Sequence, residues 1–289
     1  MNLKYMQNIN INLSSLNKFM RCKYCGGKNV IKKGFRKNLS GKVQKWFCKD
    51  CRRYFTNRKL PGFRHKISEI SLALELYTRF GISFQNLSYL LKKFRISISP
   101  SGLWKWVKKF GKKALDFLAK FGIKVANIDE TCIKNIDKRK SWLSVAVDKR
   151  SRFIFDFLLI FRRKPSKDYI KQFDKIKTDG FRAYPKLAKK LGIKWVKLKF
   201  GQNQVVERLF RTVKQRIHWL TKFRDIVNAR NFFALWISFY NFVREHLGIK
   251  KVPCEVLGMK RLSFRELVVK IFLFLVSLRW FYDLKDDDK

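Results

Sequence analysis

Apolar positions between residues 66 and 112 recur every three or four residues, a spacing that predicts three helices. The first helix is expected over Ile67–Phe80 and should end at Gly81. Ser83 can cap the second, which should reach Phe94, and Pro100 suits the first turn of the third. The apolar residues of the first helix share one face: Ile67, Ile70, Leu74 and Tyr77.

The third of these helices carries a basic row formed by Lys105, Lys108 and Lys109. Short helices joined by tight turns, with a basic last helix, are typical of a helix-turn-helix unit that reads the major groove of DNA. The sequence therefore predicts a DNA-binding helix-turn-helix over residues 63–114. The alternative is an ordinary small helical bundle whose lysine face is solvated.

Between residues 123 and 258, short strand-like runs alternate with helical ones. Strands are expected at Val125–Asp129, Trp142–Val147, Phe153–Phe161, Lys175–Thr178 and Lys194–Lys199. Helices are expected from Pro165 to about Phe173, over Tyr184–Leu191, from Asn203 to about Phe223, and over Ala229–His246. The residues Asp148–Ser151 should form a hairpin turn between the second and third strands. This order predicts an α/β domain built on a mixed sheet.

The two ends of the chain differ from its middle. Residues 1–20 form a polar leader without the apolar segment of a secretory signal. Residues 262–289 should hold an apolar helix, which opens with a capping box of Ser263 and Glu266, and then an acidic-basic tail. The apolar run Ile271–Leu278 is too short to span a bilayer. We expect the helix from Phe264 to about Tyr282 to pack against another subunit or the α/β domain.

Charge changes the picture more than any other feature of the composition. The 289 residues include 67 Lys and Arg against 21 Asp and Glu, a net charge of +46, while 46% are hydrophobic and can form a core. A chain this basic is expected to bind a polyanion, and nucleic acid is the usual one. An anionic membrane surface ranks lower, because the basic residues run through the whole chain instead of forming one cluster. We therefore expect DNA as a partner and no membrane.

Four of the six cysteines stand in two close pairs, Cys22 with Cys25 and Cys48 with Cys51. Each Cys-x-x-Cys can hold one edge of a tetrahedral zinc site, and two pairs complete a closed, structural one. Disulfides or free core thiols are the alternatives, but this spacing in a basic, signal-free chain favours one Zn²⁺ in a reducing compartment. The sequence predicts a zinc ribbon over residues 21–60, ending before Pro61.

Three acidic residues stand on the apolar framework of the α/β domain. Asp129 ends an apolar strand, Asp179 follows a short strand, and Glu207 lies on a long helix. That helix should pack on the sheet through an apolar stripe of Val206, Leu209, Phe210, Val213 and Ile217. Converging carboxylates repel unless cations separate them, and two divalent metals about 4 Å apart would do so. Taken singly, the acids could be a strand-edge turn, a turn aspartate and a surface glutamate paired with Arg211, while Glu130 should face away from Asp129.

Three blocks of the chain resemble the signature blocks of prokaryotic insertion-sequence transposases of the DDE class. They are Ile128–Thr131, Thr178–Tyr184 and Asn203–Arg216. The later run Tyr240–His246, with Pro253–Leu257 behind it, resembles the helix and tail that follow the last block in that family. A zinc ribbon and a helix-turn-helix also precede the catalytic part there, so the similarity covers roughly residues 20–258.

This resemblance implies a ribonuclease-H-like catalytic domain over residues 123–258. It places Asp129, Asp179 and Glu207 as ligands of two Mg²⁺ or Mn²⁺ ions. It also makes Lys214 the match to a basic residue that holds DNA beside the site, and we expect Arg211 and Arg216 on the same helix to bind DNA as well. The implied reaction is hydrolysis of a phosphodiester, followed by attack of the freed 3′-hydroxyl on target DNA. Joining two DNA ends in one event implies a homodimer or a higher oligomer.

Two other functions stay open at this point. One is a non-catalytic DNA-binding regulator, derived from a transposase, in which the α/β domain only dimerises. The other is an RNA-processing nuclease of the same fold. No Gly-rich phosphate loop stands in the sequence, so we expect no nucleotide cofactor. The expected location is the cytoplasm, in association with the nucleoid.

Overall fold

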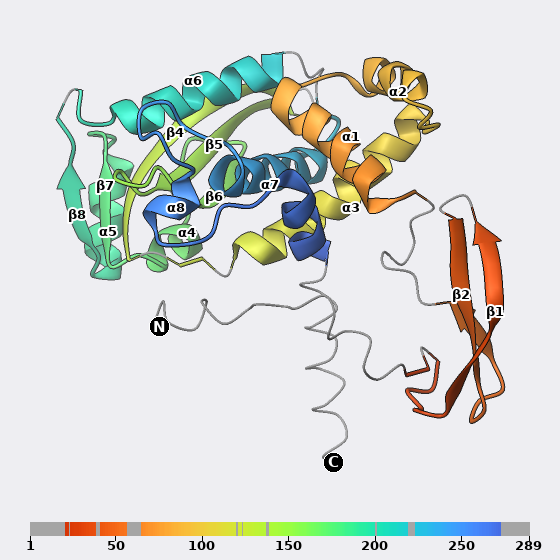
Figure 1. Cartoon of the computed structure of the whole chain (residues 1–289). Coiled ribbons are helices and arrows are strands. Elements are labelled where there is room, and N and C mark those ends of the chain that lie inside the picture. Colours follow the sequence, from red (N-terminus) through yellow and green to blue (C-terminus); the bar gives the residue numbers. More distant parts are fainter. Residues whose placement is uncertain are drawn as a thin grey trace. The chain divides into compact units, whose positions relative to one another are not determined.

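The computed structural model describes residues 21–22, 24–38, 41–56, 65–119, 121–122, 124–136, 139–199, 201–218 and 223–272. The chain divides into two compact units, residues 1–69 and residues 70–289, and Figure 1 shows the elements of both. The predicted polar leader, the boundary at Pro61 and the C-terminal tail beyond Phe272 lie outside the described residues.

The first unit contains a three-stranded antiparallel sheet in the order β1-β2-β3. Its strands are β1 (Val30–Asn38), β2 (Gly41–Cys48) and β3 (Tyr54–Thr56). Its buried core is small, with Cys22, Cys48 and Phe55 at the centre and Val30, Trp46 and Cys51 packed around them. A core of this size supplies little apolar burial, so a bound metal would add to the stability of this unit.

The second unit is built on a five-stranded mixed sheet in the order β6-β5-β4-β7-β8. The strands β4 (Val125–Ile136), β5 (Arg139–Val147) and β6 (Ile154–Ile160) form an antiparallel meander, in which β5 pairs with both β4 and β6. β7 (Lys175–Thr178) pairs parallel with β4, and β8 (Lys194–Lys197) pairs parallel with β7. Three antiparallel strands followed by two parallel strands on the far side of the first give a ribonuclease-H-like sheet, which confirms the expected fold class.

Helices cover both faces of this sheet (Figure 1). Successive residues of a strand point to opposite faces. Ala126 and Ile128 of β4 share a core with α4 (Lys167–Lys171) and α5 (Ala183–Leu191). Asp129 is reached from the other face by the start of α6 (Gln204–His218). The buried residues of α6 are four of the five predicted stripe residues: Val206, Leu209, Phe210 and Val213.

Helix α7 (Ile226–Phe242) is buried along nearly its whole length, with α3 (Pro100–Leu118) crossing it closely. A Cβ added at Gly111 of α3 would lie 2.2 Å from the carbonyl oxygen of Asn231, so only glycine permits this crossing. At the other end of α7, the side chain of Asn241 bonds both the N–H and the C=O of Ile154, at 2.9 and 2.7 Å. These bonds tie α7 to the edge strand β6.

The helices α1 (Ile67–Phe80) and α2 (Phe84–Lys93) form as predicted, and Ser83 caps α2 by accepting a bond from the Asn86 amide. Gly81 has a φ of 67°, the left-handed conformation that ends a helix. α3 runs to Leu118, beyond the expected end near residue 112, because its buried face continues through Ala114 and Leu118.

The C-terminal capping box is present as predicted, with Ser263 N donating to Glu266 Oε2 and Glu266 N donating to Ser263 Oγ. The helical residues that follow are described as far as residue 272. The ring of Phe264 packs against Phe239 of α7, and that of Phe272 packs against Phe110 of α3. The described part of this segment therefore packs on the second unit itself.

Some boundaries differ from those expected. The strand predicted to end at Asp129 continues to Ile136, because residues beyond Asp129 form a hairpin with β5. α7 begins at Ile226, where Asp225 caps it, and ends at Phe242 instead of His246. α8 (Pro253–Val256) follows. The expected hairpin turn at Asp148 is confirmed, since its carboxylate accepts bonds from the amide and hydroxyl of Ser151.

Candidate active site and metal centre

Asp129 lies on β4, and Asp179 directly follows the neighbouring parallel strand β7. β4 and β7 pair with Val125 opposite Lys175 and Asn127 opposite Lys177. The same register carried two residues beyond the last pair makes Asp179 the counterpart of Asp129, and the two carboxylates interact electrostatically. Because β7 ends at Thr178, Asp179 stands at the carboxyl end of a parallel strand, where α/β folds place ligand-binding groups. The sheet thus brings the first two predicted carboxylates together.

The surroundings of Asp129 disfavour its negative charge. Burial is the largest cause, and the nearby carboxylates of Asp179 and Glu130 add to it, so the pKa of Asp129 rises to about 6. The Glu130 amide, which donates to Asp129 Oδ1 at 2.8 Å, and the Arg163 guanidinium act in the opposite direction without offsetting the rise. A divalent cation would relieve this accumulation of negative charge.

Asn203 joins the start of α6 to the first carboxylate. Its Nδ2 donates to Asp129 Oδ2 at 2.8 Å, and its backbone carbonyl accepts bonds from the amides of Val206 and Glu207. The Asn203 Oδ1 atom is buried and has no hydrogen-bond partner among the described residues. Carboxylate and amide oxygens are the ligands that Mg²⁺ and Mn²⁺ prefer. The donor set around Asp129 therefore fits a hard divalent metal.

Glu207 lies in the first turn of α6, four residues after Asn203, and its side chain is exposed. Residues four apart share a helix face, so Glu207 stands one turn along from the contact between Asn203 and Asp129. Arg211 and Lys214, also exposed, continue along the helix. Lys214 is seven residues from Glu207, about 10 Å along the axis.

A partly buried ion-pair network joins Asp179 to Glu130 through Arg163. The Arg163 guanidinium contacts Asp179 Oδ2 at 3.2 Å and Glu130 Oε2 at 3.5 Å. Glu130 is almost fully buried and also accepts a hydrogen bond from the Tyr184 hydroxyl. Burial raises the pKa of Glu130, while Tyr184 and Arg163 act to lower it. As expected, the Glu130 side chain lies on the opposite face of β4 from the Asp129 side chain. Glu130 holds the Arg163 guanidinium in place beside Asp179.

The predicted DNA-contacting residues of α3 lie on its exposed face. Lys105, Lys108 and Lys109 are exposed, whereas Leu103, Trp106, Val107 and Phe110 are buried. The Lys108 ammonium lies over the exposed ring of Trp104, 5.1 Å from its centre. A cation beside an exposed aromatic ring suits a nucleic-acid surface.

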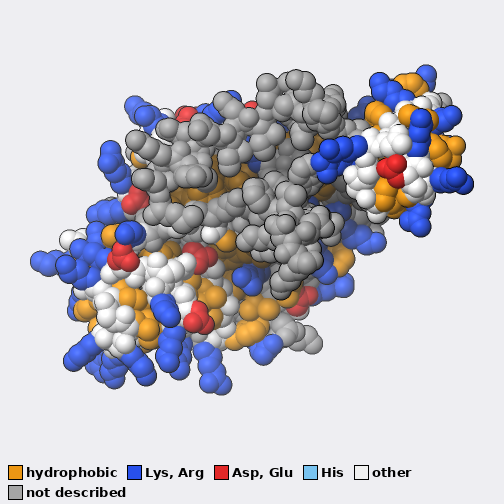
Figure 2. Space-filling view, turned by 90° about the horizontal axis from the view of Figure 1, so that it is seen from below, with side chains coloured by type: hydrophobic (Ala, Val, Ile, Leu, Met, Phe, Trp, Pro, Cys, Tyr) orange, Lys and Arg blue, Asp and Glu red, His pale blue; other side chains and the backbone are white. Residues whose placement is uncertain are grey.

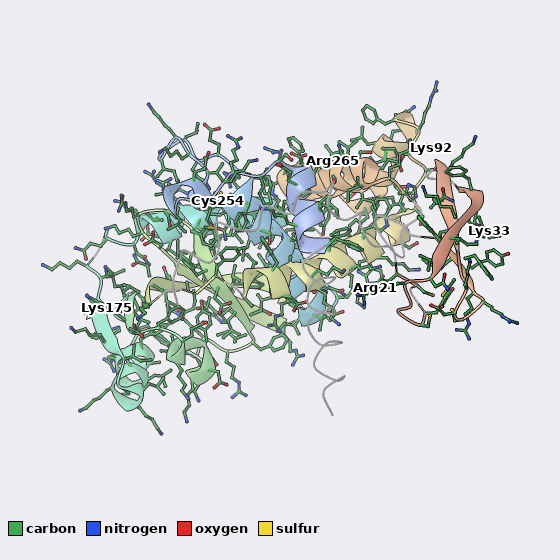
Figure 3. All side chains as sticks on the ribbon, turned by 60° about the horizontal axis from the view of Figure 1, so that its bottom comes forward. Arg21, Lys33, Lys92, Lys175, Cys254 and Arg265 are labelled. Atoms are coloured by element: carbon green, nitrogen blue, oxygen red, sulfur yellow. The ribbon has the colours of Figure 1, made fainter. Side chains whose placement is uncertain are left out.

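Basic side chains are spread widely over the surface. Figure 2 shows many Lys and Arg side chains and few Asp and Glu side chains on the face that it draws. In Figure 3, Lys92 at the end of α2 and Lys175 at the start of β7 stand far apart on the second unit. Arg216 differs from most of these residues, because it is half-buried near the end of α6.

The four predicted zinc ligands form one cluster in the first unit. The ligand atoms of Cys22, Cys25, Cys48 and Cys51 all lie within 4.8 Å of one another. Cys22 Sγ is 3.5 Å from Cys51 Sγ, and Cys25 Sγ is 3.6 Å from Cys48 Sγ. Four sulfurs bound to one zinc at about 2.3 Å would stand roughly 3.8 Å apart, so the arrangement fits a tetrahedral site.

Thiol acidity at this cluster is uneven. Burial acts to raise the pKa of the Cys22 thiol, but bonds to backbone amides, including that of Tyr24 at 3.4 Å, outweigh it and lower the pKa to about 7. Burial raises the pKa of Cys51 to about 12. Among the described residues, these four cysteines are the group of three or more potential metal ligands whose ligand atoms all lie this close together. Asp129, Asp179 and Glu207 do not form such a group.

Asn203 and Arg163 are the site residues that the sequence did not single out. Asn203 was expected only as the start of a helix, and Arg163 sits in a run of basic residues that resembles many others in the chain. Asn203 and Glu207 are four positions apart at the start of a helix, and this spacing is the one signal that could have joined them. Nothing in the sequence distinguishes Arg163 from its neighbour Arg162.

No protein-family model matches the chain. It is similar to an uncharacterized protein of Methanocaldococcus jannaschii, with 27% identity over 204 residues that cover 65% of this chain and 92% of that protein. Among the described residues, no helix combines the length and the apolar character needed to cross a membrane.

Among solved structures, the chain is similar to the HTLV-2 integrase catalytic core domain, solved with magnesium in a trimeric form. The TM-score is 0.34 at 16% identity, over 47% of this chain and 97% of that one. It is also similar to the catalytic domain of the Mos1 mariner transposase, with a TM-score of 0.33 at 10% identity, over 57% and 91% of the two chains. At these values the likenesses assign nothing beyond the mixed α/β fold already given by the strand order.

Proposed function

We propose that this chain is a DNA transposase that cuts DNA at the ends of a mobile element and joins those ends to target DNA. The observation that carries the proposal is the nearness of Asp129, on β4, to Asp179, directly after β7, together with the hydrogen bond from Asn203 at the start of α6 to Asp129. Glu207 on α6 supplies the third carboxylate. The net charge of +46 supports a polyanionic substrate.

In this proposal Asp129, Asp179 and Glu207 hold two divalent metal ions, Mg²⁺ or Mn²⁺. Such ions, when bound, would activate water and neutralise charge on the reacting phosphate. Asn203 orients Asp129 through its Nδ2 and offers its free Oδ1 to the same site. Arg163 holds the Asp179 carboxylate in position by bonding its Oδ2.

DNA would be held beside these carboxylates by the exposed cations of α6. Arg211 and Lys214 follow Glu207 on the same helix, so a phosphate bound there stands about 10 Å from the carboxylate. The exposed face of α3, with Lys105, Lys108 and Lys109, would contact the element end. Two ends must be joined in one event, so the active form would be a homodimer or a larger assembly.

The cysteine cluster would bind one structural Zn²⁺. Four cysteine ligands leave no open position on the metal, so the site has no place for a substrate. The ribbon would contribute to DNA binding through exposed cations on and beside its strands, among them Lys32, Lys33, Arg36 and Arg52.

Nicking of a supercoiled plasmid that carries the DNA flanking the gene on both sides tests the proposal. We expect Mg²⁺- or Mn²⁺-dependent nicks that leave 3′-hydroxyl ends, and Asp129→Asn should abolish them while end binding persists. Asp174→Asn is the matched control, because Asp174 is an exposed acid whose ion pair among the described residues is with the exposed Lys124, at 3.6 Å. Wild-type protein that binds the ends without nicking them would favour the regulator. Preferred cleavage of an RNA competitor would favour the RNA-processing nuclease.

A further inference from the structure

Four arginines and one histidine from separate segments gather at one end of the second unit. Arg79 belongs to the last turn of α1, Arg216 to the end of α6, and Arg244 and His246 follow α7, while Arg152 lies in the turn between β5 and β6. Arg216 lies in the electrostatic field of Arg79 and Arg244, and His246 in that of Arg244 and Arg152. These five residues are called the arginine cluster.

Close packing holds the cluster together. A Cβ added at Gly81 would lie 3.3 Å from Arg216 Nη1, so the Arg216 guanidinium rests against the end of α1. The Arg79 and Arg244 guanidinium groups lie over the rings of Phe239 and Tyr240, which are neighbours in the last turn of α7. The ring of His246 packs edge-on against Tyr240, with 4.4 Å between centres. The side chains are therefore supported by aromatic rings and are not loose surface cations.

Most of the positive charge in the cluster is uncompensated. Arg79 is paired with Glu75 at 2.7 Å, but within the described part of the chain no ion pair involves Arg152, Arg216 or Arg244. The Arg216 Nε and His246 Nε2 atoms are buried and have no hydrogen-bond partner among the residues that the structure describes. An unpaired buried donor is costly, and like charges repel, so the arrangement is unfavourable unless an anion binds there.

Titration behaviour agrees with this geometry. Burial lowers the pKa of Arg216 and of Arg244, and the neighbouring arginines lower it further. Burial, with Arg244 and Arg152 nearby, lowers the pKa of His246 to about 4, so its imidazole is neutral at pH 7. A neutral imidazole can still donate one N–H bond to an anion.

The ligand that matches this arrangement carries several oxygens and negative charge in a compact group. Guanidinium groups bind phosphate through paired, charge-assisted N–H bonds, and several arginines can surround one phosphate from different sides. We propose that the arginine cluster is a binding site for a phosphate group of the nucleic-acid backbone, separate from the contacts of Arg211 and Lys214. The nucleic-acid part of this proposal rests on the proposed function.

The cluster is distinct from the DNA contacts proposed beside the carboxylates. Arg216 is nine residues beyond Glu207 on α6, about 13 Å along the helix axis and on the opposite side of the helix. A phosphate bound at the cluster would therefore be a different phosphate from one held by Lys214, which shares the face of Glu207.

Binding of a short duplex, measured by fluorescence anisotropy across a salt series, tests the site with full-length protein. Arg244→Gln and Arg216→Gln should each weaken binding and reduce the log–log salt slope by about one unit. Lys190→Gln removes the same charge from an exposed position on α5, on the other face of the sheet, and should change the slope less. An equal effect of all three variants would overturn the proposal, because general surface charge would then explain the binding.

A second measurement separates a binding role from a structural one. His246 is one of three histidines, so its imidazole signal can be followed by NMR. The short duplex should raise the pKa of His246 by one unit or more, and inorganic pyrophosphate should do so to a similar or smaller extent; chloride at equal ionic strength should not. A rise with pyrophosphate but not with duplex would assign the site to a free phosphate compound and overturn the backbone assignment. No rise with either would overturn the site.

Both measurements use protein that carries Asp129→Asn, and neither measurement requires DNA cleavage. A failure of the arginine cluster therefore leaves the proposed strand cleavage untouched, and a failure to cleave leaves the binding result intact. Arg244→Gln removes one of the repelling cations, so the ligand-free variant should have a higher melting temperature than its parent. A purely structural arginine would give a lower melting temperature instead.

Discussion

The Nδ2 of Asn203 lies 2.8 Å from Oδ2 of Asp129, a hydrogen bond between residues 74 positions apart in the chain. It fastens the start of α6 to β4 at the point where two carboxylates already stand side by side. Because Glu207 follows Asn203 by one helical turn, the same bond determines how near Glu207 comes to the aspartates. The position of the Glu207 carboxylate therefore depends on the uncharged side-chain amide of Asn203.

Replacing Asn203 by alanine should disturb this arrangement. The Asn203→Ala variant loses one buried hydrogen bond, so the free energy of unfolding should fall by about 1 kcal/mol. Metal-dependent cleavage should fall at least tenfold, since α6 is no longer held against Asp129. Asn228→Ala is a suitable control, because its side chain bonds Asp225 on the surface at the start of α7. Equal cleavage by both variants would show that Asn203 does not position the site.

Removing Arg163 should cost stability in a pH-dependent way. Glu130 is almost fully buried, and its pKa is already raised by burial, with Arg163 acting against the rise. A carboxyl whose folded-state pKa is raised loses stability as pH increases through that pKa. Arg163→Gln should therefore lower the free energy of unfolding by about 2 kcal/mol at pH 8, and by less at pH 5. Chemical unfolding at the two pH values measures this, and Arg162→Gln should change little at either pH.

His246 should contribute an opposite dependence on pH. Its pKa is lowered to about 4 by burial and by Arg244 and Arg152, while the unfolded chain titrates near 6.5. Between these values the unfolded state binds more protons, so this contribution to stability is present above pH 6.5 and is lost as pH falls toward 4. His246→Gln should show a smaller loss of melting temperature than the parent between pH 7 and pH 5. Parallel curves for the two proteins would contradict this assignment.

The cysteine cluster should make the N-terminal unit dependent on zinc. A core of three buried residues cannot stabilise this unit by itself, so chelation should unfold it. We expect one zinc per chain by elemental analysis, and loss of both zinc and duplex affinity in Cys48→Ser. Cys254→Ser, which alters a buried cysteine of the other unit, should keep the zinc. Protein purified without chelators that contains no zinc would contradict the prediction.

Lys214 should act on DNA binding and not on metal binding. Lys214→Ala removes an exposed cation two turns beyond Glu207, so the log–log salt slope for duplex binding should fall by about one unit. Stabilisation of the variant by Mn²⁺ in thermal melts should equal that of the parent. Glu207→Gln should behave in the reverse manner, with weaker stabilisation by Mn²⁺ and unchanged or slightly tighter DNA binding.

Local patterns in the sequence were enough to predict most elements of the fold. Apolar periodicity gave α1 and the packed face of α6, and Ser83 and Ser263 cap the helices that they were expected to cap. The paired spacing of the cysteines predicted their cluster. Such signals succeed because helix caps, amphipathic faces and Cys-x-x-Cys turns depend on residues close together in the chain.

Only the tertiary structure decided what surrounds the carboxylates. The register of β4 with β7 pairs residues 50 positions apart, and it brings Asp129 near Asp179, the residue that follows β7. The bond from Asn203, the bridge of Arg163 between Asp179 and Glu130, and the unpaired burial of Arg216 all join distant segments. Among 67 basic residues, sequence alone could not tell a buried, unpaired arginine from a solvated one, because burial and the absence of a counter-charge arise only when separate elements pack together.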